Sequence, residues 1–132
     1  MNPNLTQKVA ILEPHEILRQ CLAEILIYLN YEVVIKSGNT LDFIEQLAMT
    51  DDPPQVIISE IELSDVRGLS IFRHFRFHYP EVKLLAFSVD DSEWSVDLAL
   101  EQGADLFLRK GCSLKSLQQA LESIMDKDFQ TK

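Results

Sequence analysis

The chain alternates between two patterns of hydrophobic and polar positions. Short apolar runs, rich in β-branched residues, recur along it, and a longer stretch with apolar residues at helical spacing follows each run. A short run of this kind predicts a strand, and the longer stretch predicts an amphipathic helix. The strands are expected at residues 9–12, 32–36, 56–58, 82–87 and 105–109, with the second more exposed than the others.

The apolar stripes predict which side of each expected helix is buried. In the first stripe, after the break at Pro14, Cys21 is expected to be a small buried side chain. Trp94, in the fourth helix, is expected to be partly packed core rather than a binding hot spot. The stripes are, in order, Ile17, Leu18, Cys21, Leu22, Ile25, Leu26 and Leu29; Leu41, Ile44, Leu47 and Ala48; Leu69, Phe72, Phe75 and Tyr79; Leu98, Ala99 and Leu100; Leu114, Leu117, Ala120, Leu121 and Ile124.

Polar residues, glycine and proline predict where the helices begin and end. The expected caps are Asn39 or Thr40 for the second helix, a capping box of Asp90 with Glu93 for the fourth, and Ser113 for the fifth. Pro80 ends the third helix and Gly103 the fourth. No structure is expected after Asp126.

The regular alternation of five strands with five helices predicts an α/β fold. Such alternation gives a parallel sheet with right-handed crossovers and helices on both faces, which is a doubly wound sheet. The chain has 132 residues, which suits one domain with one core. We find no linker, repeat or low-complexity stretch, so a single domain is expected over residues 1–132, with its core at about 8–126.

Four of the expected strands are followed by a chemically active side chain. Glu13 follows the first, Glu60 the third, Ser88 ends the fourth and Lys110 follows the fifth. In an open doubly wound sheet these strand ends share one edge, where α/β proteins place their sites. Each residue alone has an ordinary explanation as a solvated strand end, a helix cap or a compensating charge. Their joint occurrence predicts a functional site.

Charge and composition exclude several classes of function. The net charge is −9 and the pI about 4.7, which argues against direct nucleic-acid binding and against an anionic membrane surface. No stretch approaches the length of a transmembrane helix, and the first residues have no signal-peptide pattern. We therefore expect a cytoplasmic protein.

At this point the sequence resembles a known family. The resemblance covers roughly residues 8–125 and rests on the segments 9–19, 54–68, 87–88, 103–110 and 117–121. The chain resembles the receiver domains of bacterial two-component response regulators, most of all receivers that precede a helix-turn-helix output domain. This resemblance implies the flavodoxin-like, CheY-like strand order 2-1-3-4-5.

The family pattern assigns a role to each residue at the shared edge. It implies that Glu60 stands where the phosphate-accepting aspartate normally lies, and that Glu13 and Pro14 stand where a pair of acids holds Mg²⁺. The remaining roles that the resemblance implies are a carbonyl ligand to the metal at Glu62, a hydroxyl for the phosphate at Ser88, a cation for the phosphate at Lys110 and a switch aromatic at Phe107.

Two of these positions depart from the family. Pro14 has no side-chain oxygen and replaces the acid that touches the metal directly, so Mg²⁺ binding at Glu13, Glu60 and Glu62 is expected to be lost or very weak. Glu60 is one methylene longer than aspartate, and a misplacement near 1 Å can cost about 10²-fold in rate. We therefore expect a pseudo-receiver that does not depend on phosphorylation and is not an enzyme.

Two interpretations of Glu60 stay open. Its carboxylate could reach Lys110 and Ser88 and replace the acyl phosphate as a fixed charge, or the domain could be a scaffold that has lost its chemistry. The alternative function is a phosphate-accepting receiver with Glu60 as acceptor, in a phosphorelay or at the N-terminus of a DNA-binding regulator. A flavodoxin-like cofactor binder is weaker, because no Gly-rich phosphate loop follows the first strand.

The resemblance also implies where partners bind. In the family the fourth helix, fifth strand and fifth helix form the output and dimer face. A histidine kinase, an output domain or a second copy of the chain is expected there.

Overall fold

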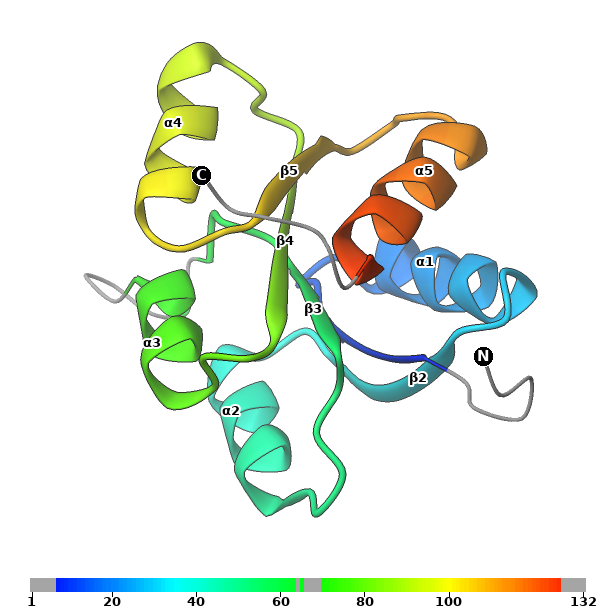
Figure 1. Cartoon of the computed structure of the whole chain (residues 1–132), viewed down its shortest axis with the longest axis vertical. Coiled ribbons are helices and arrows are strands. Elements are labelled where there is room, and N and C mark those ends of the chain that lie inside the picture. The colour runs from blue at the N-terminus through cyan, green and yellow to red at the C-terminus, as the bar shows by residue number, and fades with distance from the viewer. Residues whose placement is uncertain (1–6, 64, 66–69, 127–132) are drawn as a thin grey trace.

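The apolar runs pair into a parallel sheet in this computed structural model, which describes residues 7–63, 65 and 70–126. Within those residues the strand order is β2-β1-β3-β4-β5, so the predicted α/β fold and its order are confirmed (Figure 1). The strands are β1 (Lys8–Leu12), β2 (Glu32–Ser37), β3 (Val56–Ser59), β4 (Lys83–Ser88) and β5 (Leu106–Arg109).

Helices cover both faces of the sheet (Figure 1). One face carries α1 (Glu16–Tyr28) and α5 (Leu114–Met125). The other carries α2 (Thr40–Met49), α3 (Ile71–His78) and α4 (Glu93–Glu101). The sheet is therefore doubly wound, as the alternation predicts.

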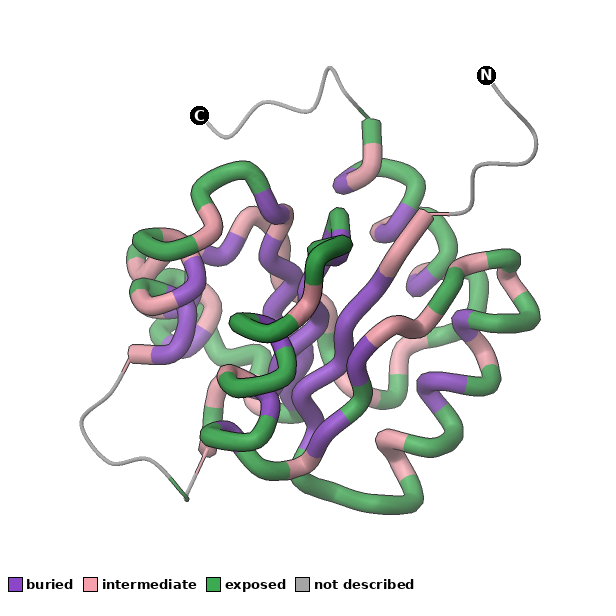
Figure 2. Tube along the Cα trace, turned by 90° about the horizontal axis from the view of Figure 1, so that it is seen from below, coloured by how far each residue is buried: buried purple, intermediate pink, exposed green. Residues whose placement is uncertain are grey.

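The core lies on both sides of β3, whose four residues are all buried. Ile57 packs into the cluster under α2, α3 and α4, while Val56 and Ile58 pack into the cluster under α1 and α5. Successive side chains of a strand point to opposite faces, so an unbroken apolar run fits a strand covered on both sides. Figure 2 shows the buried strands between helices whose outer sides are exposed.

Several predicted burials are wrong. Cys21 is exposed, because α1 turns Leu22, Ala23 and Leu26 toward the sheet and Cys21 lies at the edge of that side. Trp94 is 73% exposed, because the sheet side of α4 is formed by the small residues Ser95 and Ala99.

The second helix also presents a different side from the one predicted. Leu41 is exposed, and Phe43 is fully buried with Leu47. Phe43 makes an edge-to-face contact with Phe75 of α3, with ring centroids 5.6 Å apart. A large aromatic ring therefore decides which side of α2 packs. Leu69, expected in the third stripe, lies outside the described residues.

The helix caps follow the predictions except at α4. Asn39 accepts from Asp42 N at the start of α2, and Ser113 accepts from Ser116 N at the start of α5. At α4 the cap is Ser92, which accepts from Ser95 N, so the expected capping box is wrong. Asp90 instead binds Ser92 N at 3.1 Å and Ser95 Oγ at 2.7 Å. Gly103, with φ 122°, follows the end of α4 as predicted.

Candidate functional site

The strand ends bring three charged side chains to one edge of the sheet. Leu12 pairs with Ser59 across β1 and β3, so the residues that follow them, Glu13 and Glu60, extend from the same edge. Ser88 of β4 pairs with Arg109 of β5, which places Lys110 at that edge as well. Glu13 is 1% exposed and Glu60 is 7% exposed. The pairing of the parallel strands therefore creates a buried charged cluster.

Lys110 is the centre of this cluster. Its Nζ lies 2.5 Å from Glu60 Oε1 and 2.7 Å from Glu13 Oε1. Burial alone would lower the pKa of the Lys110 ammonium, but its contacts with Glu13 and Glu60 outweigh burial and raise the pKa above the usual lysine value. The Glu60–Lys110 contact expected from the sequence is present.

The second oxygen of Glu60 turns back on the loop that follows it. Glu60 Oε2 accepts hydrogen bonds from Ile61 N at 2.7 Å and Glu62 N at 2.9 Å. Both carboxylate oxygens of Glu60 are therefore bound to donors of the chain itself. The longer side chain of glutamate allows this return, because its carboxylate can fold back over the next two peptide groups.

Glu13 is held in a similar way. Its Oε2 accepts from His15 N at 3.0 Å, and its backbone carbonyl accepts from Arg19 Nη1 at 2.8 Å. Its Oε1 has no hydrogen bond from the described residues and is balanced by the Lys110 charge. Arg19 was given no role from the sequence, because helical spacing does not show that a side chain returns to the preceding loop.

The side chain of Ser88 binds none of these groups, although its backbone carbonyl accepts a hydrogen bond from Lys110 N at 2.8 Å. It is fully buried, and its Oγ has no hydrogen-bond partner within the part of the chain that the structure describes. The expectation that Glu60 binds Ser88 as well as Lys110 is therefore wrong. The reason is the direction of Glu60 Oε2, which takes the loop amides instead.

Phe107 and Glu62, the other two residues with expected roles, lie outside the ion-pair cluster. Phe107 is half-buried in β5 and packs against the core cluster under α2, α3 and α4. The side chain of Glu62 is exposed. Their roles stay predictions.

The loop after Glu60 has a second attachment that the sequence did not reveal. Asp65 accepts hydrogen bonds from Thr40 N and Thr40 Oγ1, both at 2.7 Å, at the start of α2. Burial raises the pKa of Asp65, but the bonds from Thr40 outweigh it and hold the pKa below the usual aspartate value. The residues are 25 positions apart, so only the fold brings them together.

The donors at this edge do not fit a Mg²⁺ site. Mg²⁺ requires near-octahedral oxygen ligands and is usually held by one or two free carboxylates. Here the oxygens of Glu13 and Glu60 contact Lys110 or backbone amides, and Pro14 offers no side-chain donor. Among the described residues, no group of three His, Cys, Asp or Glu side chains is placed to hold a metal ion.

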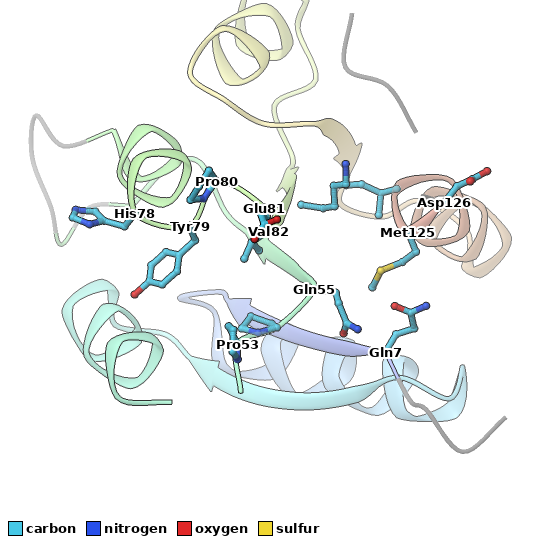
Figure 3. Close-up of a pocket in the computed structure, with 13 residues that line it drawn as sticks. Gln7, Pro53, Gln55, His78, Tyr79, Pro80, Glu81, Val82, Met125 and Asp126 are labelled. Atoms are coloured by element: carbon cyan, nitrogen blue, oxygen red, sulfur yellow. The ribbon is translucent and has the colours of Figure 1, made fainter. Parts of the chain in front are cut away.

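A cavity of about 510 Å³ lies at the opposite end of the sheet (Figure 3). It is next to Gln55 and Lys83, where β3 and β4 begin, and none of the predicted site residues lines it. Its wall consists of Gln7, Pro53, Pro54, Gln55, His78, Tyr79, Pro80, Glu81, Val82, Lys83, Ile124, Met125 and Asp126. The charged cluster and this cavity are therefore separate features.

Comparison with known families decides the classification. The model of the response regulator receiver domain matches residues 9–122. The chain belongs to this family. None of the helices within the described residues is long and apolar enough to cross a membrane.

Two curated relatives are regulators of transcription. The transcriptional regulatory protein DegU of Brevibacillus brevis is 28% identical over 94% of this chain and 52% of its own length. A probable transcriptional regulatory protein of Picosynechococcus is 30% identical over 83% of this chain and 45% of its own length. The chain thus spans about half the length of these relatives.

Solved receiver structures share the fold. The isolated receiver domain of RcsB from Salmonella enterica, with the phosphate mimic BeF₃⁻, has a TM-score of 0.82 at 16% identity, covering 93% of this chain and 91% of that one. A receiver domain protein from Clostridium thermocellum has a TM-score of 0.80 at 16% identity, covering 92% and 95%. At this identity the likeness concerns the fold alone.

Proposed function

We propose that this receiver signals through protein contacts without being phosphorylated. The observation that supports it is the Glu60 carboxylate, which lies at the end of β3 with Lys110 on one oxygen and two loop amides on the other. Those donors are the kind that an added phosphate group would require. Glu60 uses them itself.

Phosphorylation of Glu60 would have to break this arrangement first. The attacking carboxylate oxygen would lose either the ammonium of Lys110 or both backbone amides. Phosphoryl transfer depends on positioning and on neutralising charge, normally with a metal ion. We infer that Mg²⁺ does not bind here at ordinary concentrations, because Pro14 replaces one ligand and the oxygens of Glu13 and Glu60 are engaged.

Of the two interpretations of the domain, the contacts favour a permanently set receiver, in which Glu60 takes the place of the acyl phosphate as a fixed charge, over an inert scaffold. A scaffold would have no need for a buried cation held between two carboxyl groups, since such clusters are weak stabilisers at best. A set receiver requires a negative charge that Lys110 can bind at all times. Glu60 supplies that charge at 2.5 Å.

Acetyl phosphate provides a direct test. The parent chain, Glu60→Asp, Pro14→Asp and the double variant are incubated with acetyl phosphate and Mg²⁺ and followed by intact mass spectrometry. We expect no label on the parent and slow labelling of each single variant. Because residues that act as a unit are non-additive, the double variant should label far faster than the product of the single effects.

Glu62→Asp is the matched control, since it makes the same change at an exposed acid of the same loop. Labelling of the parent at Glu60 would favour the alternative, a phosphate-accepting receiver. Two features favour this alternative: the Ser88 hydroxyl, which has no partner in the described part of the chain, and the nearby Lys110. A folded double variant that stays unlabelled would show that other residues disabled the site.

The partner is proposed to bind the face formed by α4, β5 and α5. On α4, Leu100 is an exposed apolar residue, whereas Trp94 lines the groove toward α3 and Leu114 of α5 lies next to α1. The net charge of −9 favours a protein partner over DNA for this part of the molecule. We place the protein in the cytoplasm, where histidine kinases, output domains and further copies of the chain are available.

Affinity capture from the native cell tests this face. Leu100→Ala should lose the bound partner, whereas Met49→Ala, which changes an exposed apolar residue on α2, should retain it. Equal capture by both variants would place the partner elsewhere. Analytical ultracentrifugation of the purified chain separates a second copy from a different protein.

A further inference from the structure

Two histidines lie side by side on α3, away from the charged cluster. His74 and His78 are one helical turn apart, and their ring centroids are separated by 4.5 Å at an interplanar angle of 47°. Residues four apart share one side of a helix. His74 is half-buried and His78 is exposed, so both rings can be reached from solvent.

The arginines of α3 do not occupy that side. Arg76 turns toward β5, where Nη2 lies 2.6 Å from Asp105 Oδ2 and 2.9 Å from the carbonyl of Gly103. Arg73 lines the groove between α3 and α4. Figure 3 shows His78 on the outer side of α3, with Tyr79 extending toward α2. No cation of α3 is therefore directed at the histidine pair.

We propose that His74 and His78 chelate a divalent late transition metal. With metal–nitrogen bonds of about 2.1 Å and each ring centre roughly 1.1 Å behind its nitrogen, two imidazoles that bind one ion at right angles have ring centres roughly 4.5 Å apart, which the 4.5 Å separation matches. Imidazole favours Cu²⁺, Ni²⁺ and Zn²⁺, and two histidines at i and i+4 of a helix are an established zinc-binding arrangement. The hard cation Mg²⁺ prefers oxygen and is excluded.

The site is open, because two protein ligands leave the other coordination positions to water. Binding would join the last two turns of α3, which is eight residues long and ends at His78. A metal that binds only the folded chain raises its thermal stability by mass action. A bound ion would also add positive charge to an acidic protein.

Isothermal titration of the untagged full chain with Ni²⁺ tests the proposal. Ni²⁺ is a suitable probe because the exposed thiol of Cys21 does not reduce it. The parent should bind one Ni²⁺ per chain, and its unfolding temperature should rise at saturation. Mg²⁺ should give neither effect. His74→Gln and His78→Gln should each weaken binding by at least the roughly 10- to 100-fold that loss of an outer-shell partner costs.

The third histidine of the chain supplies the matched control. His15 caps α1 because its Nδ1 accepts from Leu18 N, and His15→Asn puts a side-chain oxygen acceptor in its place. This variant should bind Ni²⁺ like the parent. The double variant of His74 and His78 should bind none while its circular dichroism stays that of a folded chain. Parent-like affinity in that folded double variant, or no binding by the parent, would overturn the proposal.

Discussion

Lys110 and Arg76 each connect strand ends to a carboxylate, but they lie at opposite ends of the sheet. Arg76 binds Asp105, which precedes β5, and its remaining bonds go to the carbonyls of Pro80, Val82 and Gly103. The carboxylate that Arg76 binds is that of Asp105 alone among the contacts described. Lys110 has two carboxyl groups around it, and the Ser88 hydroxyl on the same edge has no partner among the described residues. A balanced cluster serves the fold, whereas an unbalanced and incompletely bonded one is typical of a functional site.

Loss of Lys110 should lower the free energy of unfolding more than any other change in these two clusters. Lys110→Met would leave Glu13 and Glu60 buried without their cation, which we expect to cost about 3–5 kcal/mol of unfolding free energy. Urea denaturation measures it. Arg109→Met is the control, because Arg109 is 54% exposed and its pair with Asp91 spans 3.4 Å, so its loss should cost at most about 1 kcal/mol. Equal stability of the two variants would mean that the Lys110 cluster is solvated.

Loss of Arg76 should have a smaller effect. Arg76→Met removes one partner of Asp105 and the donor for three carbonyls, but 32% of the Arg76 side chain is exposed and water can replace part of the network. We expect a loss of about 1–3 kcal/mol by urea denaturation. Labelling of the Glu60→Asp, Pro14→Asp protein should not change when Arg76→Met is added. A change in labelling would contradict the separation of the two ends.

Alkaline pH should weaken the Lys110 cluster and leave the Arg76 cluster unchanged. The pKa of Lys110 is raised in the folded protein, so the stability that its charge contributes is complete below the unfolded value of 10.5 and is lost as pH rises through the higher folded pKa. Arg76 stays protonated throughout. The stability difference between the parent and Lys110→Met should therefore shrink above pH 10.5, while that between the parent and Arg76→Met should not. Parallel pH profiles for both variants would contradict this.

Ser88→Ala should have the smallest effect. The Ser88 hydroxyl is buried and has no partner among the residues that the structure describes, so its removal should change the unfolding free energy by less than about 1 kcal/mol and in the stabilising direction. Ser37→Ala is the contrasting control, because Ser37 Oγ donates to Asp42 at 2.7 Å and its loss should destabilise. Destabilisation by Ser88→Ala would mean that its hydroxyl has a partner, such as water, in solution.

The sequence predicted the parts of the fold that depend on local patterns. The short runs around Ile11 and Ile57 gave strands because apolar runs of that length suit a sheet covered on both faces. The strand ends then brought Glu60 and Lys110 together, since parallel strands share their carboxyl edge. Neither the strands nor their shared edge depends on which side of each helix packs against the sheet.

The failures concern packing and long-range hydrogen bonds. Helical spacing in α4 could not show that Ser95 rather than Trp94 faces the sheet, because small residues pack closely where the spacing alone is ambiguous. Nor could it show that Asp65 binds Thr40, or that Glu60 turns to the loop amides instead of Ser88. Such bonds are decided by side-chain direction after the chain has folded.

The Glu60–Lys110 contact has a consequence for the timing of a signal. An acyl phosphate hydrolyses, so a phosphorylated receiver reverts by itself and its output follows the enzymes that add and remove the group. A carboxylate at the same place is permanent for the life of the molecule. Under the proposed function, the output of this domain would rise and fall only with the number of copies in the cell, and synthesis and proteolysis would take the place of kinase and phosphatase.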